Sequence, residues 1–312
     1  MNHSASFMTA IRYHRHGGPE VLQVEQAPFP QPQAGEVLVR IHHAGVLPVD
    51  WKLRQGLMPV PVNFPVIPGT AFAGVIAEIG PGVTGFRPGQ AVFGRSPKGT
   101  YAAYTTAAVE AIAPKPDALP FAEAASLSGG ATTAWQALVH DGALKAGDRI
   151  LIHGAAGGVG LYAVQFARWI GATVIGTASP ANMDFVRSLG AAEVVDYTTT
   201  PFEQAAAEVD FVLDTVGGPT LERSWAVVKR GGTLVSLLAQ PSEERAQALG
   251  IRALKPSRTA GTADLEAIAR LIEQGHVRTF IGPVLPLAQA AEAHRLSQSG
   301  HGRGRILLHV GD

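Results

Sequence analysis

Cysteine is missing from the sequence, which has 312 residues. Its absence excludes disulfides, zinc sites built on thiolates, and cysteine nucleophiles. Charged residues are scarce as well, at 16% of the chain, and the acidic and basic residues cancel to a formal net charge of zero. Nucleic-acid-binding proteins usually carry a basic excess, so we expect no nucleic-acid partner.

Long apolar runs are also missing. No stretch approaches the ~20 apolar residues that a membrane-spanning helix needs. Residues 1–6, MNHSAS, do not form the basic and then apolar pattern of a secretion signal. We therefore expect a soluble cytoplasmic protein without a membrane partner, and the chain length predicts two domains or one large one.

The most informative segment is the glycine run at residues 154–160, GAAGGVG. An apolar run, residues 149–153, precedes it, and apolar residues spaced for one helix face follow it up to Ile170. A strand, a glycine turn and a helix in this order predict a pyrophosphate site at the helix N-terminus. A tight turn without a ligand is the alternative, because alanine replaces the first glycine of the fingerprint at Ala155.

The next predicted strand, residues 173–177, bears on the choice of cofactor. Dinucleotide folds that prefer NAD place an acidic residue at the end of this strand, where it binds the ribose 2′-hydroxyl. Here no acid occurs before Asp184, and Ser179 and Asn182 could donate hydrogen bonds to a 2′-phosphate. This favours NADP over NAD, although no lysine or arginine lies between residues 177 and 186.

The hydrophobic pattern divides the chain into two domains of an α/β protein. Short alternating segments separated by glycine and proline over residues 1–120 predict a β-rich, barrel-like domain. Strands and helices alternate over residues 121–274, which predicts a doubly wound parallel sheet. Residues 275–312 contain a helix and end in an apolar strand at 305–310 that could return to the first domain.

Several motifs occur in one characteristic order. They are GGPEVL (17–22), AGVLPVDW (44–51), IPGT (67–70), the glycine run, SLGAA (188–192), VVDY (194–197), DTVGG (214–218) and GHGRGRI (300–306). Together they resemble the quinone oxidoreductase branch of the zinc-free medium-chain dehydrogenase/reductase superfamily. The resemblance extends over nearly the whole chain.

This resemblance implies a Rossmann-type sheet plus a GroES-like barrel domain. It further implies reduction of quinones or α,β-unsaturated carbonyls by NADPH without a metal. It also implies a homodimer formed through the edge of the nucleotide-binding sheet, with residues 251–255 as the edge strand.

The same resemblance implies a set of cofactor-binding residues: Leu47, Thr133, Ala156, Gly157, Gly158, Val159, Ser179, Asn182, Tyr197, Thr215, Leu237, Leu238 and Arg303. Core packing is an alternative role for Tyr197, Leu237 and Leu238. Thr133 could instead supply a capping or surface hydroxyl, and Arg303 could be a solvated surface charge. The chain departs from the family at Leu47, where many relatives have asparagine, and at Ala71, where relatives often have an acid.

No catalytic acid is evident from the sequence. Asp50 and Trp51 are candidates, with helix capping and core packing as their alternatives. We interpret His42, His43 and His153 as structural or surface residues, because they lack a thiolate partner or a paired histidine motif.

Two other functions stay open at this point. An NADPH-binding sensor or structural protein with little turnover would bind the cofactor without oxidising it. A zinc alcohol dehydrogenase is opposed by the absence of cysteine.

Overall fold

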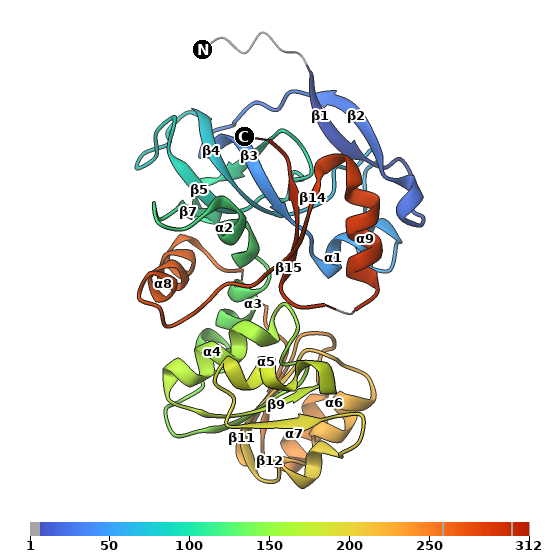
Figure 1. Cartoon of the computed structure of the whole chain (residues 1–312), viewed down its shortest axis with the longest axis vertical. Helices are drawn as coiled ribbons and strands as arrows, with labels where there is room; N and C mark the ends of the chain where they lie inside the picture. The colour runs from blue at the N-terminus through green and yellow to red at the C-terminus, as the bar shows by residue number, and fades with distance from the viewer. Residues whose placement is uncertain (1–6, 258, 301, 312) are drawn as a thin grey trace. The chain divides into compact units, whose positions relative to one another are not determined.

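The computed structural model describes residues 7–257, 259–300 and 302–311. Its contacts divide the chain into two compact units (Figure 1). The first unit comprises Met1–Gly129, Gly261–Glu273 and Arg278–Asp312, and the second comprises Gly130–Ala260 and Gln274–Val277. The second unit therefore consists of two segments that interrupt the chain of the first.

The first unit is built on a seven-stranded sheet with the order β14-β15-β3-β4-β5-β7, in which β6 also pairs with β3. A separate antiparallel pair, β1 and β2, belongs to the same unit. The strands are β1 (Phe7–Arg12), β2 (Gln23–Pro28), β3 (Glu36–Gly45), β4 (Ala71–Ile79), β5 (Ala91–Arg95), β6 (Tyr104–Ala108), β7 (Ile112–Pro114), β14 (Ile281–Pro286) and β15 (Arg305–His309). Along β3, the alternating Val37, Val39 and Ile41 face the hydrophobic core, as a half-buried strand requires.

The tail of the chain returns to this sheet. β15 pairs antiparallel with β3, with Leu307 opposite Gly45 and Leu308 opposite Ala44. The strand predicted at residues 305–310 is thus confirmed. β14 pairs parallel with β15, and the sequence did not predict it, because Pro283 and Pro286 fall inside the strand.

Four helices belong to the first unit: α1 (Pro48–Arg54), α2 (Phe121–Leu127), α8 (Thr262–Glu273) and α9 (Ala290–Gln298). Two of them, α2 and α8, lie within the range that the sequence pattern placed in the dinucleotide domain. α2 packs against β3 and β4, where a side chain on Gly45 would lie 3.0 Å from the carbonyl oxygen of Ala125. α8 is held by Thr262, whose hydroxyl donates to the carbonyls of Val109 and Ile112. Helical periodicity does not show which sheet a helix will cover, so the domain boundaries drawn from the sequence differ here from the contact units.

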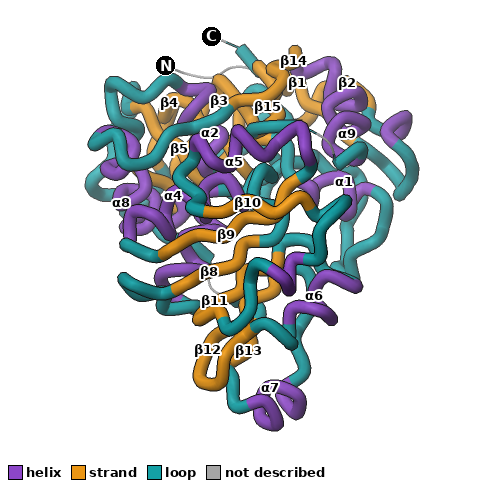
Figure 2. The backbone as a smooth tube through the Cα atoms, turned by 60° about the horizontal axis from the view of Figure 1, so that its bottom comes forward, coloured by secondary structure: helices purple, strands orange, loops and turns teal. Residues whose placement is uncertain are grey.

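The second unit contains a six-stranded, fully parallel sheet with the order β10-β9-β8-β11-β12-β13. Figure 2 shows these strands side by side. Their bounds are β8 (Arg149–Ile152), β9 (Thr173–Ala178), β10 (Glu193–Asp196), β11 (Val209–Asp214), β12 (Val228–Ser236) and β13 (Arg252–Leu254). This is the strand order of the dinucleotide-binding fold, with its topological switch between β8 and β11. The predicted doubly wound sheet is confirmed.

The helices of the second unit are α3 (Ala131–Trp135), α4 (Gly160–Ile170), α5 (Met183–Ser188), α6 (Pro219–Ser224) and α7 (Glu243–Leu249). The alanine-rich segment 121–139 is helical except at residues 128–130. Gly129 there has a φ of +84°, which favours glycine. Beyond the break, α3 continues into a π-helical turn, η3 (Gln136–His140).

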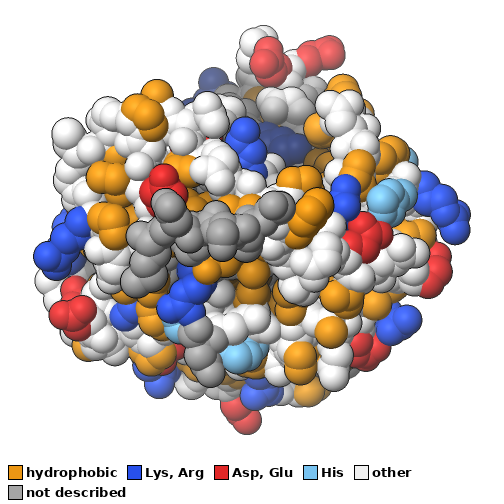
Figure 3. Space-filling view, turned by 90° about the horizontal axis from the view of Figure 1, so that it is seen from above, with side chains coloured by type: hydrophobic (Ala, Val, Ile, Leu, Met, Phe, Trp, Pro, Cys, Tyr) orange, Lys and Arg blue, Asp and Glu red, His pale blue; other side chains and the backbone are white. Residues whose placement is uncertain are grey.

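Charged side chains of both signs are interspersed with apolar ones on the face shown in Figure 3. None of the helices in the described parts of the chain combines the length and apolar character needed to cross a membrane.

Candidate functional site

The glycine turn joins β8 to α4 at the carboxyl end of β8. Gly154 adopts a φ of +66°, and the N–H of Gly157 donates to its carbonyl oxygen over 2.9 Å. A Cβ on Gly160 would lie 2.1 Å from that same oxygen and 2.8 Å from the Cα of Ala155. The turn therefore packs its backbone so closely that residue 160 must be glycine.

Backbone donors are available at this turn. α4 is 11 residues long and begins at Gly160, with Val159 as its N-cap. The helix bonds start with the N–H of Leu161, which donates to Gly157, and that of Ala163, which donates to Val159. Across the described ranges, the N–H groups of Gly158, Val159 and Gly160 make no backbone hydrogen bond. Free N–H groups at the positive end of a helix suit an anion such as a pyrophosphate.

The carboxyl ends of β9 and β10 bring together three predicted residues. Ser179 is the N-cap of the short helix η4 (Pro180–Asn182), and the Asn182 amide donates to the Ser179 hydroxyl over 3.2 Å. The N–H of Tyr197, whose side chain is 60% exposed, donates to the carbonyl of Ala178 over 3.3 Å. Asp184 lies on α5, fully exposed and paired with Arg187 over 2.7 Å. No carboxylate therefore ends β9.

On the other side of the glycine turn lie Thr215, Leu237 and Leu238. The Thr215 hydroxyl donates to the carbonyl of His153 over 2.7 Å. The N–H of Leu237 donates to the carbonyl of Asp214 over 2.9 Å. A Cβ on Gly217 would lie 3.0 Å from the Cβ of Leu238. The loops after β11 and β12 thus touch each other and the turn, as the parallel order predicts for neighbouring strand ends.

The remaining predicted cofactor residues are placed as follows. Thr133 is half-buried in α3, and Ala156 is buried within the turn. Leu47 and Arg303 belong to the first unit, where Leu47 is 5% exposed and Arg303 is exposed in the loop before β15. The Leu47 side chain covers Gly129, since a Cβ on that glycine would lie 2.7 Å from a Leu47 methyl carbon.

Asp50 caps α1 from within. Its carboxylate Oδ2 accepts the N–H of Leu47 over 2.8 Å and the hydroxyl of Tyr101 over 3.0 Å, and the side chain is almost fully buried. Burial raises the pKa of Asp50 to about 7, against the lowering effect of these two hydrogen bonds and of the charges on Arg305 and Arg95. The capping interpretation holds in the structure, and the carboxyl still titrates near neutral pH.

A buried chain of hydrogen bonds runs from Arg54, on the same helix, through His294 and Tyr101 to Asp50. The Arg54 guanidinium donates to His294 Nδ1 over 3.0 Å, and His294 Nε2 lies 3.3 Å from the Tyr101 hydroxyl. Burial, together with the charge on Arg54, lowers the pKa of His294 to about 3, so the ring is neutral and Nε2 carries its proton. Each donor in the chain therefore points toward the Asp50 carboxylate.

Trp51, the other catalytic candidate, is half-buried on α1, with the Lys52 ammonium 5.6 Å from its ring centroid. Its indole nitrogen is buried and finds no acceptor among the described residues. The indole N–H is therefore a polar group that its own surroundings leave unpaired.

The three histidines considered as ligands make other contacts. His42 stacks on Phe121 with ring centroids 4.1 Å apart, and His43 lies 5.0 Å from the ring of His309. His153 is buried, its Nε2 lying 3.0 Å from the Ser224 hydroxyl, and burial lowers its pKa to about 4. In the described ranges, no three His, Asp or Glu side chains are grouped so that they could hold a metal ion.

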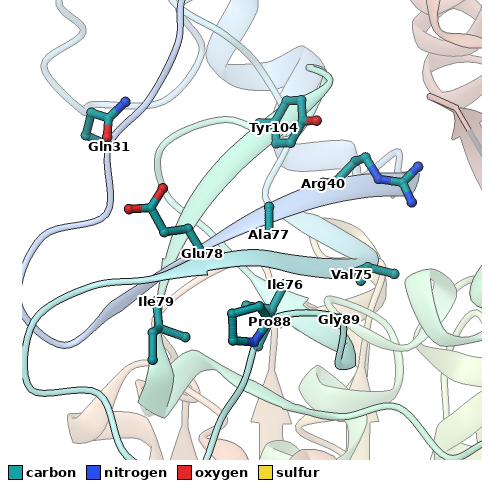
Figure 4. A pocket seen from close by; sticks show the side chains of 10 residues that line it. All are labelled: Gln31, Arg40, Val75, Ile76, Ala77, Glu78, Ile79, Pro88, Gly89 and Tyr104. Atoms are coloured by element: carbon teal, nitrogen blue, oxygen red, sulfur yellow. The ribbon is translucent and has the colours of Figure 1, made fainter. Parts of the chain in front are cut away.

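A groove of about 830 Å³ lies elsewhere on the first unit, over β4 (Figure 4). Glu78 points across it toward Gln31, and Arg40 and Tyr104 come from the neighbouring strands. None of the predicted site residues lines it.

Sequence reasoning missed several residues of these clusters. Asp214 and Ser236 end β11 and β12 and are fully buried polar residues. A polar residue that ends an apolar strand was the available signal for both. Tyr101 and His294 are 193 residues apart in the chain, and nothing in the sequence connects them.

Comparison with known proteins agrees with this geometry. Residues 33–117 match the family model of the alcohol dehydrogenase GroES-like domain, and residues 189–308 match that of the zinc-binding dehydrogenases. The chain is 32% identical to a chloroplast envelope quinone oxidoreductase homolog of Arabidopsis thaliana, over 98% of this chain and 99% of that protein. It is also 32% identical to the quinone oxidoreductase of Sus scrofa, over 96% and 97% of the two chains.

A solved structure gives the same result. The quinone oxidoreductase of Coxiella burnetii superposes with a TM-score of 0.90 at 32% identity, covering 98% of this chain and all of that one. These matches confirm the predicted combination of a GroES-like domain with a Rossmann-type sheet. The chain therefore belongs to the quinone-oxidoreductase-like branch of the medium-chain dehydrogenase/reductase superfamily, a family of pyridine-nucleotide-dependent oxidoreductases.

Proposed function

We propose that this protein uses NADPH to reduce quinones or α,β-unsaturated carbonyls, without a metal ion. The observation that carries the proposal is the glycine turn between β8 and α4, whose free N–H groups fit the pyrophosphate of a dinucleotide. When bound, the nicotinamide supplies the hydride. The protein's own residues bind and orient the cofactor and hold protons.

The preference for NADPH rests on the end of β9. Ser179 and Asn182 present a hydroxyl and an amide there, and the nearest acid, Asp184, points into solvent with its own partner. A 2′-phosphate would meet these donors, and no carboxylate lies at the end of β9 itself.

The metal-free proposal rests on the residues themselves. One matching family model is named for zinc, yet this chain has no cysteine. Zinc-dependent relatives carry a cysteine in the segment that corresponds to residues 44–50, and here that segment has none. Two of the relatives are named quinone oxidoreductases, which supports this class of acceptor.

We also assign roles to the other predicted residues. The phosphates would lie along Thr133, Ala156, Gly157, Gly158 and Val159.

Tyr197 would lie beside the adenosine, and Thr215 would approach a ribose. Leu47, Leu237, Leu238 and Arg303 would lie toward the nicotinamide.

Asp50 is the proposed acid, because a carboxyl with a pKa of about 7 exchanges a proton readily at neutral pH. Trp51 is the proposed wall for an aromatic acceptor. We also propose a homodimer, since β13 (Arg252–Leu254) forms one edge of the six-stranded sheet.

The test measures initial rates of oxidation of NADPH and NADH by the purified protein, with 1,4-benzoquinone and with an aliphatic enone. We expect turnover with NADPH and the quinone, and weak turnover with NADH. NADPH binding without oxidation by either acceptor would contradict the enzymatic proposal and favour a cofactor sensor.

Two variants at the end of β9 sharpen the cofactor test. Ser179→Asp places a carboxylate where the 2′-phosphate is expected, and should shift kcat/KM toward NADH by about tenfold or more. Ser179→Asn has nearly the same shape without the charge and is the matched control. An equal response of both variants would show that Ser179 does not face the 2′-phosphate.

A further inference from the structure

The side chain of Asp214 joins two loops of the second unit. It is fully buried at the end of β11, and its Oδ1 accepts the N–H groups of Val216 over 3.0 Å and Gly217 over 2.8 Å. Its Oδ2 accepts the hydroxyl of Ser236, the last residue of β12, over 2.8 Å. Ser236 in turn accepts the N–H groups of Leu238 and Ala239, each over 3.4 Å. We call residues 214–218 and 236–239 the paired loops.

The paired loops depend on this carboxylate for their shape. Gly217 and Gly218 have φ values of +77° and +57°, which favour glycine. Because glycine has no side chain, these two residues cannot hold the loop in this conformation by their own packing. A buried carboxylate is costly unless hydrogen bonds satisfy it, and here it receives three. Two of the bonds fix the shape of loop 214–218, and the third, from Ser236, ties this loop to loop 236–239.

The paired loops also border the glycine turn. A Cβ on Gly154 would lie 2.6 Å from the Thr215 hydroxyl. In the dinucleotide fold, the pyrophosphate lies at the first helix N-terminus and the adenosine ribose lies over the second strand, here β9. The other half of the dinucleotide must then extend over β11 and β12, where the paired loops lie.

We propose that Asp214 and Ser236 are positioning residues for the nicotinamide half of the cofactor. The assignment rests on the proposed function. Neither side chain is exposed, so they act through the backbone of the paired loops. A purely structural role would lower stability and weaken every ligand alike, whereas a positioning role weakens the whole dinucleotide and leaves its adenosine fragment unaffected.

The experiment compares the dissociation constants of NADPH and 2′,5′-ADP by titration calorimetry. Ser236→Ala removes the side-chain bond between the loops and leaves the backbone bond from Leu237 to Asp214. It should weaken NADPH binding about tenfold, in proportion to a lost hydrogen bond, while the dissociation constant of 2′,5′-ADP changes less than about twofold. Asp214→Asn keeps an acceptor for the two N–H groups and should weaken NADPH binding less than Ser236→Ala does. If Ser236→Ala does not fold, Asp214→Asn supplies the same comparison.

Asp210→Asn is the matched control, because Asp210 lies near the opposite end of the same strand and accepts the N–H of Arg149 there. It should change neither affinity. If Ser236→Ala weakens the binding of both ligands equally, or of neither, the positioning assignment is overturned and the proposed function is not. A wild-type protein that binds neither ligand overturns the proposed function together with this assignment.

Discussion

Asp50 is a residue on which two opposing effects act. Burial favours the neutral carboxyl, while the hydrogen bonds from Leu47 and Tyr101 favour the carboxylate, and burial is the larger effect. The folded protein therefore binds a proton at this site more tightly than the unfolded chain does. Between the ordinary pKa of 3.8 and the folded value of about 7, this group lowers the free energy of unfolding as the pH rises.

We expect Asp50→Asn to remove this pH dependence. The amide oxygen can accept from the same two donors, and the side chain carries no charge at any pH. Relative to the wild type, the free energy of unfolding of the variant should rise between pH 4 and pH 8 by up to about 4 kcal/mol. Urea denaturation at each pH measures it.

Asp117→Asn, a substitution at an exposed position, is the control and should follow the wild-type curve. Parallel curves for Asp50→Asn and the wild type would mean that the Asp50 carboxylate is ionised throughout this pH range.

At the scale of single residues, the sequence indicates the local role of a side chain better than its hydrogen-bond partners. It offers helix capping as one interpretation of Asp50, because an acid often precedes a helix. In the structure Asp50 is the third residue of α1 and accepts the N–H of Leu47. It does not predict the chain from Arg54 through His294 and Tyr101, because these residues meet only after α1, α9 and the loop before β6 have packed. The roles of Asp214 and Ser236 also depend on the pairing of β11 with β12.

The glycine turn is the element whose conformation the sequence predicts best. Its strand, turn and helix follow from local pattern alone, and the structure confirms all three. Gly160→Ala should destabilise the protein by about 1–3 kcal/mol and weaken NADPH binding, because the new Cβ would meet the Gly154 carbonyl oxygen at 2.1 Å. Thermal unfolding and calorimetry measure the two effects.

Two other glycines calibrate this prediction. Gly157→Ala would place its Cβ 3.2 Å from the same oxygen and should have a smaller effect. Gly261→Ala, with its nearest atom at 3.6 Å, should be neutral or slightly stabilising. A Gly160→Ala protein that melts at the wild-type temperature would show that the turn relaxes without cost.

Elements that depend on distant partners were predicted less well. β7 is only three residues long, and β14 contains prolines, so neither shows an alternating pattern. The sequence pattern assigned the segments of α2 and α8 to the dinucleotide domain, whereas the structure places both helices in the first unit. In each case the missing information is the identity of the packing partner.

At the scale of the whole molecule, the two units have separate hydrophobic cores. One gathers Val39, Phe72 and Leu308, and the other gathers Leu151, Val212 and Leu234. A ligand stabilises the state that binds it, by about 2.7 kcal/mol at 100 times its dissociation constant. The residues proposed to bind 2′,5′-ADP all belong to the second unit.

We therefore expect 2′,5′-ADP to slow hydrogen exchange in β8, β9 and β11 more than in β3 and β4. Mass spectrometry of exchanged peptides measures it, with 5′-AMP as the control that lacks the 2′-phosphate and should protect less. Equal protection of both sets of strands would mean that the two units unfold together.

The pairing of β15 with β3 has a consequence for synthesis on the ribosome. β3 is made early, but its neighbour on one side follows about 260 residues later, after the entire second unit. At ≈ 5–20 residues per second, that interval lasts on the order of tens of seconds. During it, the edge of β3 that β15 later covers, at residues 43–45, stays open, while β4 is already available to the other edge. An open strand edge of this kind can pair with another chain.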